Sequence, residues 1–509
     1  MFDFKAPQDD ILFSLVHVAD AARIDSWDSD MATDIIGHFS NLAEGVIAPL
    51  NASGDAQGAR LEQGRVRMPD GFKNAYLQLA DDGWQGLTAP ESFGGMGVSP
   101  AIAAGVSEIF SGANHALQMV CNLVPGAITT LRRFGTPSQQ QDWIPRLASG
   151  EALSTMCLSE PSAGSDLSTI RCRARTTETG WQIDGEKIFI SGGDQDMSDT
   201  ILHLVLARTG TDEDGIRGLS LFLCGAQPAI SVTRIEDKMG LHASPTCQLR
   251  FDAAAAELVG QEGEGLKAMF TLMNHARIDV ALQGVAHASR AAQIARLYTA
   301  ERRQGRTQKG ETAMLADHAD VQRMLDEQAI LAIGARAMCH IALVELELGT
   351  RPALAEFLTP LCKVFGSQAG IRSADLGIQL LGGYGYLREY AVEQHWRDAR
   401  IAAIYEGANG IHEKTLVTRG LRQGGGADEF AALIGELADD ATAIEPVFTE
   451  WQSLRTKLSR DQDPLPAAHD FAALSAKLYL QACWQRIGHM AHHHPEPQYL
   501  SHLANKTAA

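Results

Sequence analysis

A single glutamate, Glu406, is the strongest candidate for acid–base chemistry in this sequence. It lies between an aromatic residue and a glycine in the stretch 404–410, which reads IYEGANG. In an apolar pocket a carboxylate loses hydration, and its pKa rises towards what a general base for a weakly acidic C–H needs. The alternative is a glutamate that favours a helix start through the helix dipole. The rest of the chain must decide between the two.

Two further segments could lie against a flat polar ring. Segment 157–166, CLSEPSAGSD, offers backbone N–H groups and hydroxyls in a turn that glycine allows to approach a ring closely. A Ser- and Gly-rich turn before a strand is the plainer interpretation. In segment 185–192, GEKIFISG, Phe189 and Ser191 share one face of a predicted strand because side chains alternate. An ordinary half-buried strand would look the same.

Other motifs are weaker by themselves. Arg302 has the forked donors that suit phosphate, although a solvated helix end explains it equally well. Segment 379–385, QLLGGYG, is glycine-rich, but it follows a helical pattern outside any βαβ unit, and a helix stop at Gly382 explains it. The histidines 492–494 stand beside prolines and predict a loose solvated run, so we predict no metal site.

Composition narrows the class of protein. The net charge of −19 argues against nucleic-acid binding, and eight scattered cysteines without a CxxC pair are typical of reduced thiols. The N-terminus, MFDFK, has no basic segment before an apolar run, and no apolar stretch is long enough to span a bilayer. We expect a cytoplasmic protein with no membrane span.

The periodicity of apolar residues divides the 509 residues into four parts. The pattern of residues 1–153 predicts an N-terminal helical domain. Residues 154–255 alternate between apolar and polar, which predicts a small β-barrel or sandwich. The pattern of residues 256–422 predicts a four-helix bundle. Residues 423–509 predict an additional helical segment, with a glycine linker at 424–426 near its start.

Three local expectations follow from turn and cap residues. Asp184-Gly185 is the preferred pair for a tight hairpin turn. Gly349, with a proline soon after, predicts the end of the second bundle helix. Thr359 followed by Pro360 predicts the start of the third.

The order of these motifs and elements resembles the acyl-CoA dehydrogenase family over about residues 80–421. Segments 157–166, 185–192, 379–385 and 405–407 resemble its motifs, in its order. The resemblance implies an α+β multidomain fold: an N-terminal helical domain, a middle β domain and a C-terminal four-helix bundle. It also implies FAD as cofactor and a role in fatty acid metabolism.

The resemblance assigns roles residue by residue. It implies FAD contacts at Leu158, Ser159, Phe189, Ser191, Arg302, Gln379, Gly382, Gly383, Ala408 and Gly410. It implies substrate contacts at Ser165, Arg277 and Gly407. Phe189 and Ser191 stand where the family usually has Trp and Thr, and they still supply an aromatic ring and a hydroxyl. Gln304 and Gly305 replace the usual Thr and Phe, so the packing around the adenosine must differ.

The family carries its catalytic base at one of two positions. One is the glutamate of Tyr-Glu-Gly, and the other precedes the arginine of the first long bundle helix. The second position is Ala276 here, beside Arg277, and alanine accepts no proton. Glu406 is therefore the expected base for α,β-dehydrogenation of an acyl-CoA to its 2-enoyl-CoA, with hydride transfer to flavin N5. Its backbone N–H would help hold the thioester oxygen.

The chain's length and both helical extensions look most like the 3-methylmercaptopropionyl-CoA dehydrogenase-like subgroup. The family implies an electron-transferring flavoprotein as acceptor, and a homodimer or dimer of dimers. An acyl-CoA oxidase, with the same base and O2 as acceptor, is the alternative. A nitroalkane oxidase is less expected because such relatives carry aspartate as base. The acidic C-terminal segment disfavours a DNA-associated flavoprotein of the same fold. The acyl chain stays open.

Overall fold

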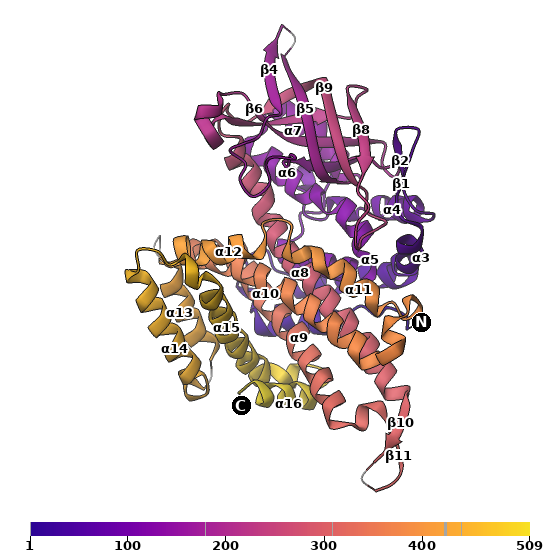
Figure 1. Cartoon of the computed structure of the whole chain (residues 1–509), viewed down its shortest axis with the longest axis vertical. Coiled ribbons are helices and arrows are strands. Elements are labelled where there is room, and N and C mark those ends of the chain that lie inside the picture. The colour runs from indigo at the N-terminus through magenta and orange to yellow at the C-terminus, as the bar shows by residue number, and fades with distance from the viewer. Residues whose placement is uncertain (1, 179, 308, 422–424, 439, 509) are drawn as a thin grey trace. The chain divides into compact units, whose positions relative to one another are not determined.

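The computed structural model describes residues 2–178, 180–307, 309–421, 425–438 and 440–508, with backbone alone at 271–276, 441 and 508 (Figure 1). These residues form two compact units. Unit 1 contains Met1–Glu44, Pro100–Ala113 and Arg277–Ala509, and unit 2 contains Gly45–Ser99 and Asn114–Ala276.

Unit 2 is built around a small barrel. Its seven-stranded sheet contains β3 (Ala152–Cys157), β4 (Arg173–Thr177), β5 (Gly180–Ser191), β6 (Thr200–Arg208), β7 (Leu219–Gly225), β8 (Ile230–Ile235) and β9 (Thr246–Val259). The order β6-β4-β5-β9-β7 closes into a ring because β7 pairs back with β6. Strand β3 lies parallel to β6, and β8 pairs with β9. The predicted β domain is confirmed, and it is a barrel.

Helices and a short hairpin complete unit 2. They are α3 (Leu50–Gln57), β1 (Arg60–Glu62), β2 (Arg65–Arg67), α4 (Phe72–Asp81), α6 (Leu123–Phe134) and α7 (Pro137–Ala148). Helices α6 and α7 pack against β3. Thr136 and Gln139 form a capping box that starts α7.

The hairpin predicted at Asp184-Gly185 is wrong. Both residues lie inside the long strand β5, which pairs with β4 from Gly180 onwards. The pairing of β5 with β9 shifts register between Ile183 and Gly185. A Cβ on Gly185 would lie 2.8 Å from Cys172 Cα, so this glycine serves close packing.

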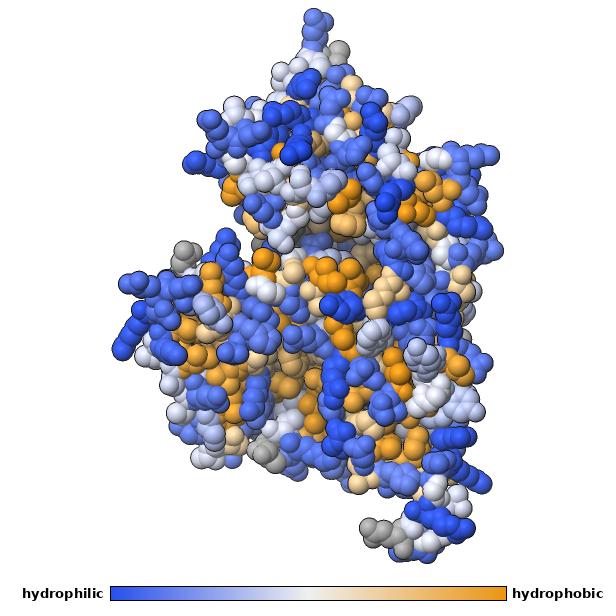
Figure 2. All heavy atoms as spheres, viewed as in Figure 1, coloured by the Kyte–Doolittle hydropathy of each residue, from blue (hydrophilic) through white to orange (hydrophobic). Residues whose placement is uncertain are grey.

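The β4–β5 end of the barrel is hydrophilic (Figure 2).

Long helices form the core of unit 1. The elements are α1 (Gln8–Phe13), α2 (Ser29–Leu42), α5 (Pro100–Cys121), α8 (Gly265–Glu301), β10 (Arg303–Arg306), β11 (Thr312–Met314), α9 (Ala319–Leu348), α10 (Pro352–Leu381), α11 (Val392–Ala399) and α12 (Asn409–Thr415). Helices α5 and α8 begin or end in unit 2. Helices α8 and α10 cross at backbone contact, because a Cβ on Gly284 would lie 2.1 Å from Gly366 O. Side chains on their facing sides therefore come close together.

Two helix boundaries test the cap predictions. Helix α9 ends at Leu348, and Gly349 follows with a φ of 64°, as predicted. The predicted start of the next helix at Thr359 is wrong, because α10 already begins at Pro352 and Pro360 lies inside it. The Thr359 hydroxyl donates to Ala355 O at 2.8 Å, so it bonds its own helix instead of capping it.

Contrary to the expectation that no apolar stretch is long enough to span a bilayer, α9 is long and apolar enough to do so by length and composition, the one such helix among the described residues. Within this protein, however, 72% of its most apolar window is buried. It packs against α10, and the C-terminal segment covers it as well.

The C-terminal segment is helical, as predicted. It contains α13 (Gly426–Leu437), α14 (Ala441–Arg460), α15 (Ala468–Met490) and α16 (Pro497–Ala508). Tyr479 Oη and Trp484 Nε1 of α15 donate to the α9 carbonyls of Met338 and Ile330, at 3.1 and 3.2 Å. Of the predicted linker at 424–426, Gly424 lies outside the described residues and Gly426 already begins α13.

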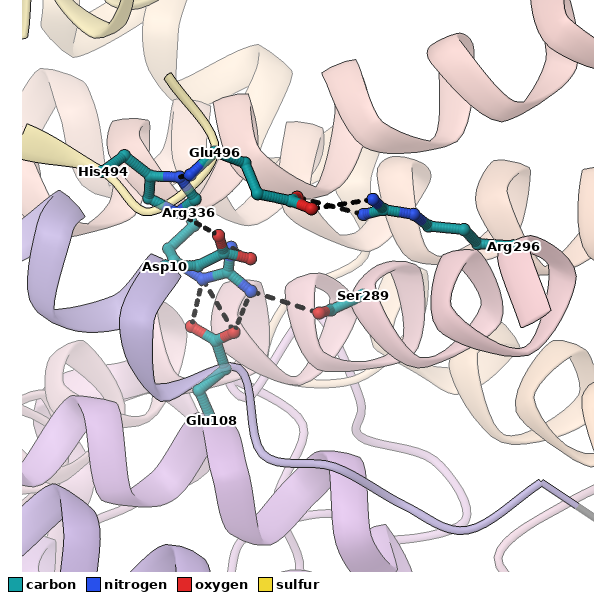
Figure 3. Close-up of polar contacts among 7 residues, drawn as sticks. All are labelled: Asp10, Glu108, Ser289, Arg296, Arg336, His494 and Glu496. Carbon is teal, nitrogen blue, oxygen red and sulfur yellow. Dashed lines mark hydrogen bonds and ion pairs between the residues drawn. The ribbon is translucent and has the colours of Figure 1, made fainter. Parts of the chain in front are cut away.

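The prediction of a loose histidine run is wrong. His493 stacks on His17 with ring centroids 4.0 Å apart, and His494 is buried. His494 Nε2 donates to Asp10 Oδ1 at 2.9 Å (Figure 3). Arg336 lies beside Asp10 and forms a buried ion pair with Glu108, at 2.7 Å. A charged network thus joins α1, α5 and α9 to the chain before α16.

Glu108→Gln should destabilise unit 1 strongly, because the buried Arg336 guanidinium loses its closest carboxylate. In the described network, Asp10 at 3.4 Å is the carboxylate that remains beside it. We expect a loss of about 3–5 kcal/mol in the free energy of unfolding, measured by urea denaturation. Arg323→Gln, which removes exposed ion pairs to Asp320 and Glu327, is the control and should change little. Equal midpoints for the two variants would contradict the importance of the buried pair.

Candidate functional site

Glu406 lies in a strained turn of unit 1, between α11 and α12. Its φ is 53°, in the left-handed region that non-glycine residues rarely adopt, and the φ of Gly407 is 93°. Such a conformation costs roughly 1–3 kcal/mol and persists only where the surroundings enforce it. The chain therefore holds this glutamate in one particular direction.

The Glu406 carboxyl is poorly solvated. Its Oε2 atom is buried and has no hydrogen-bond partner among the described residues. Burial raises the pKa of Glu406 to about 7, and the positive charges of Arg277 and Lys363 oppose that rise. The predicted desolvated carboxylate is present, and two cations act on it: Arg277, which the sequence analysis expected at the site, and Lys363, which it did not.

Lys363 is a site residue that the sequence analysis missed. It comes from α10, and its side chain is fully buried. Its ammonium donates to Gly407 O at 2.6 Å and to Asn409 Oδ1 at 3.0 Å. Burial lowers the pKa of Lys363 to about 8, against the attraction of Glu406. A lysine within the apolar run 361–365, LCKVF, was the signal that could have identified it.

His412 was also missed. Its Nε2 atom lies 3.0 Å from Glu406 O, so this nitrogen carries the proton and donates. Burial, together with the charges of Lys363 and Arg277, lowers the pKa of His412 to about 4, so the ring is neutral at pH 7. A Cβ on Gly407 would lie 2.7 Å from this Nε2 atom, which explains why position 407 requires glycine. No sequence pattern indicated this contact.

A chain of hydrogen bonds fixes Tyr405. Its hydroxyl donates to Gln283 Oε1, and Gln283 Nε2 donates to Asp279 Oδ2 at 2.8 Å. Ser107 Oγ of α5 donates to the other oxygen of Asp279. Residues of α5 and α8 therefore anchor the side chain next to Glu406.

In unit 2, a buried ion pair joins the two segments that could face a ring. Lys187 Nζ donates to Glu160 Oε1 at 2.9 Å and to Leu158 O at 2.8 Å. Ile188 N donates to Ser159 O at 2.9 Å. Segment 157–166 is thereby attached to β5, so Leu158 and Ser159 lie beside the strand that carries Phe189 and Ser191.

Phe189 presents an aromatic ring outwards. It has a φ of 58° and lies at a register shift between β5 and β9, and 62% of the residue is exposed. Ser191 is half-buried two residues later, and Ser165 is exposed. An exposed aromatic next to a hydroxyl fits a flat polar ring.

The remaining predicted residues fall into two groups. Ala408 and Gly410 begin α12 next to Glu406. Gln379, Gly382 and Gly383 are exposed at the far end of α10, about 24 Å along the helix from Lys363. Arg302 joins this second group because its guanidinium lies over the Tyr384 ring, 5.7 Å from the centroid.

The chain offers no evident metal centre in its described part. No group of three or more His, Cys, Asp or Glu side chains there is placed to hold an ion. Ala276, the rival position for the base, lies among residues whose side chains are not described.

The sequence matches all three domains of one family. Residues 37–151, 155–254 and 263–421 match the N-terminal, middle and C-terminal domains of acyl-CoA dehydrogenases. A 3-methylmercaptopropionyl-CoA dehydrogenase of Ruegeria pomeroyi is 36% identical over 91% of this chain and 85% of its own length. A broad-specificity linear acyl-CoA dehydrogenase of Mycobacterium tuberculosis is 32% identical over 77% of this chain and 70% of its own length.

A solved structure supports the fold of the whole chain, extensions included. A Caenorhabditis elegans protein in complex with C11-CoA superposes with a TM-score of 0.82, covering 100% of this chain and 92% of that one, at 18% identity. By its three domains and its relatives, the chain belongs to the acyl-CoA dehydrogenase family, FAD-dependent flavoproteins that dehydrogenate acyl-CoA thioesters.

Proposed function

We propose that Glu406 is the base that removes the α-proton of a bound acyl-CoA. The observation that carries this proposal is the buried Oε2 atom without a hydrogen-bond partner, on a carboxyl whose pKa burial raises to about 7. Such a carboxylate is ionised over much of the neutral range, yet it is more basic than an exposed one. Arg277 and Lys363 limit that basicity, because each favours the ionised form.

The neighbouring residues hold the base and substrate in place. Tyr405, through Gln283 and Asp279, anchors the turn from one side, and Lys363 and His412 hold its carbonyls from the other. Gly407 leaves room for the His412 ring, and the backbone N–H of Glu406 polarises the thioester oxygen. FAD, when bound, accepts the β-hydrogen as a hydride.

We propose that the FAD of this chain contacts Leu158, Ser159, Phe189 and Ser191 through its flavin ring. The exposed ring of Phe189 and the anchoring of segment 157–166 to β5 support this assignment. We also propose FAD contacts at Ala408 and Gly410, and acyl-CoA contacts at Ser165, Arg277 and Gly407.

The second group of residues supports a homodimer. Arg302, Gln379, Gly382 and Gly383 are exposed, and Gln379 lies about 24 Å along α10 from Lys363. If they bind FAD, the simplest arrangement is that they bind the FAD of a partner subunit. We therefore propose a homodimer or a dimer of dimers, cytoplasmic, with an electron-transferring flavoprotein as electron acceptor.

A short thioether acyl-CoA is the substrate that we propose first, because the Ruegeria relative is named for 3-methylmercaptopropionyl-CoA. Anaerobic bleaching of the bound flavin by a panel of short, branched, aryl, thioether and long acyl-CoAs tests this choice. The thioether substrate should bleach the flavin fastest. Faster bleaching by a long linear acyl-CoA would contradict the proposed substrate.

Glu406→Gln should keep FAD but lower kcat/KM about 100- to 10,000-fold, because an amide accepts no proton. The measurement is turnover with the acyl-CoA that bleaches the wild-type flavin. Glu413→Gln, the same change at a carboxyl that bonds His469 at 3.0 Å, is the matched control and should change the rate little. Full turnover in Glu406→Gln would place the base elsewhere.

The rate should also depend on pH through Glu406. Because a base acts when deprotonated, kcat/KM should be level above about pH 8 and fall about tenfold per pH unit below about pH 6. The sign follows from the raised pKa of the carboxyl. A profile already level at about pH 5 would mean that the carboxyl has its ordinary pKa and that burial does not tune it.

Phe189→Ala should weaken FAD binding roughly tenfold, because it removes the aromatic contact with the flavin. The ratio of flavin to protein absorbance after gel filtration measures this loss. Ile216→Ala changes another exposed apolar residue of unit 2 and should retain full flavin. Equal flavin content in the two variants would show that Phe189 does not contribute to FAD binding.

A further inference from the structure

Two buried side chains take up the two successive carbonyl oxygens of the turn that carries Glu406. His412 Nε2 donates to Glu406 O at 3.0 Å, and Lys363 Nζ donates to Gly407 O at 2.6 Å. Both side chains come from helices, α12 and α10, whose positions packing fixes. The turn is therefore held at two consecutive peptide planes.

This arrangement fixes the direction of the backbone N–H groups as well. In a trans peptide the N–H points away from the C=O, so the N–H groups of Gly407 and Ala408 point away from His412 and Lys363. Within the described residues, no backbone carbonyl accepts a hydrogen bond from the N–H of Glu406, Gly407 or Ala408. The turn thus directs N–H groups away from the helices that hold it.

Burial of the Lys363 ammonium costs free energy that a purely structural contact would not require. Burying an ammonium group is unfavourable unless it is well paired, and a neutral donor could hold the same carbonyl. Its ammonium bonds Gly407 O and Asn409 Oδ1, and Asn409 is itself fixed by Ser367 Oγ at 3.1 Å. The charge therefore has a role that a neutral donor would not fill.

That role follows from the charged groups around Glu406. Arg277 approaches it from α8, Lys363 from α10 and the neutral His412 from α12. Tyr405 bonds Gln283, and the Asp279 carboxylate acts on Tyr405. Lys363 both contacts the turn as a hydrogen-bond donor and brings a positive charge near the carboxyl.

We propose that Lys363 is a positioning residue for dehydrogenation, which holds the Glu406–Gly407 turn through Gly407 O and places a positive charge next to the base. This inference rests on the proposed role of Glu406 as base. It separates two contributions of one side chain, a hydrogen bond to the turn and a charge near the base.

Two substitutions in the holoenzyme separate these contributions. Lys363→Met removes both hydrogen bond and charge, whereas Lys363→Gln keeps an N–H donor and removes the charge. Both should raise the apparent pKa in the kcat/KM profile by about one unit, because a nearby positive charge is lost. At high pH, Lys363→Met should lose about 10- to 100-fold in kcat, and Lys363→Gln clearly less.

Thr359→Val is the matched control, since Thr359 is buried one turn earlier on α10 and its hydroxyl bonds only its own helix in the contacts described. It should leave both pKa and rate unchanged. Flavin content and circular dichroism of each variant report folding. If Lys363→Met fails to fold, the pKa shift in Lys363→Gln decides the proposal.

The outcomes separate this inference from the proposed function. If Glu406→Gln is inactive but both Lys363 variants keep the wild-type pKa, the positioning role is refuted while the base assignment stands. A loss of rate without any pKa shift would likewise make Lys363 merely structural and refute the proposal. If Glu406→Gln stays active, the proposed base is wrong whatever the Lys363 variants do.

Discussion

The desolvation of one carboxyl, Glu406, is the constraint on which this site depends. Burial raises its pKa to about 7, while Arg277 and Lys363 act in the opposite direction. Burial makes this carboxylate more basic than an exposed one, and the two cations favour its ionised form. The balance explains why a basic residue with a lowered pKa, Lys363, lies fully buried beside a carboxyl with a raised one.

The fold supplies that balance through close helix packing and a strained turn. Glycines at the α8–α10 crossing bring the two helices to backbone contact, and one of these helices carries Arg277 and the other Lys363. Glu406 then adopts a left-handed conformation that Lys363, His412 and Tyr405 enforce. The buried Arg336–Glu108 pair stabilises the same unit (Figure 3). Strain at the turn is thus sustained by interactions spread over several helices.

The sequence was sufficient for features that depend on local pattern. It predicted the β domain, the helical bundle, the helix end at Gly349 and a desolvated glutamate. It failed where long-range packing overrides local preference: Asp184-Gly185 packs against Cys172 inside a strand, and Thr359 lies within a helix that starts earlier. Lys363, His412 and His494 were missed because their partners lie far away in the chain or in a turn whose conformation no local pattern predicts. The roles of the predicted FAD and substrate residues stay predictions.

A direct titration of the Glu406 carboxyl tests the central claim most directly. Infrared difference spectra between wild type and Glu406→Gln isolate the C=O stretch of this one protonated carboxyl as pH is varied. The account predicts a band that disappears with a midpoint near pH 7, the value to which burial raises this pKa. A midpoint near the ordinary value of 4.5 would show that the carboxyl is effectively solvated and would contradict the account.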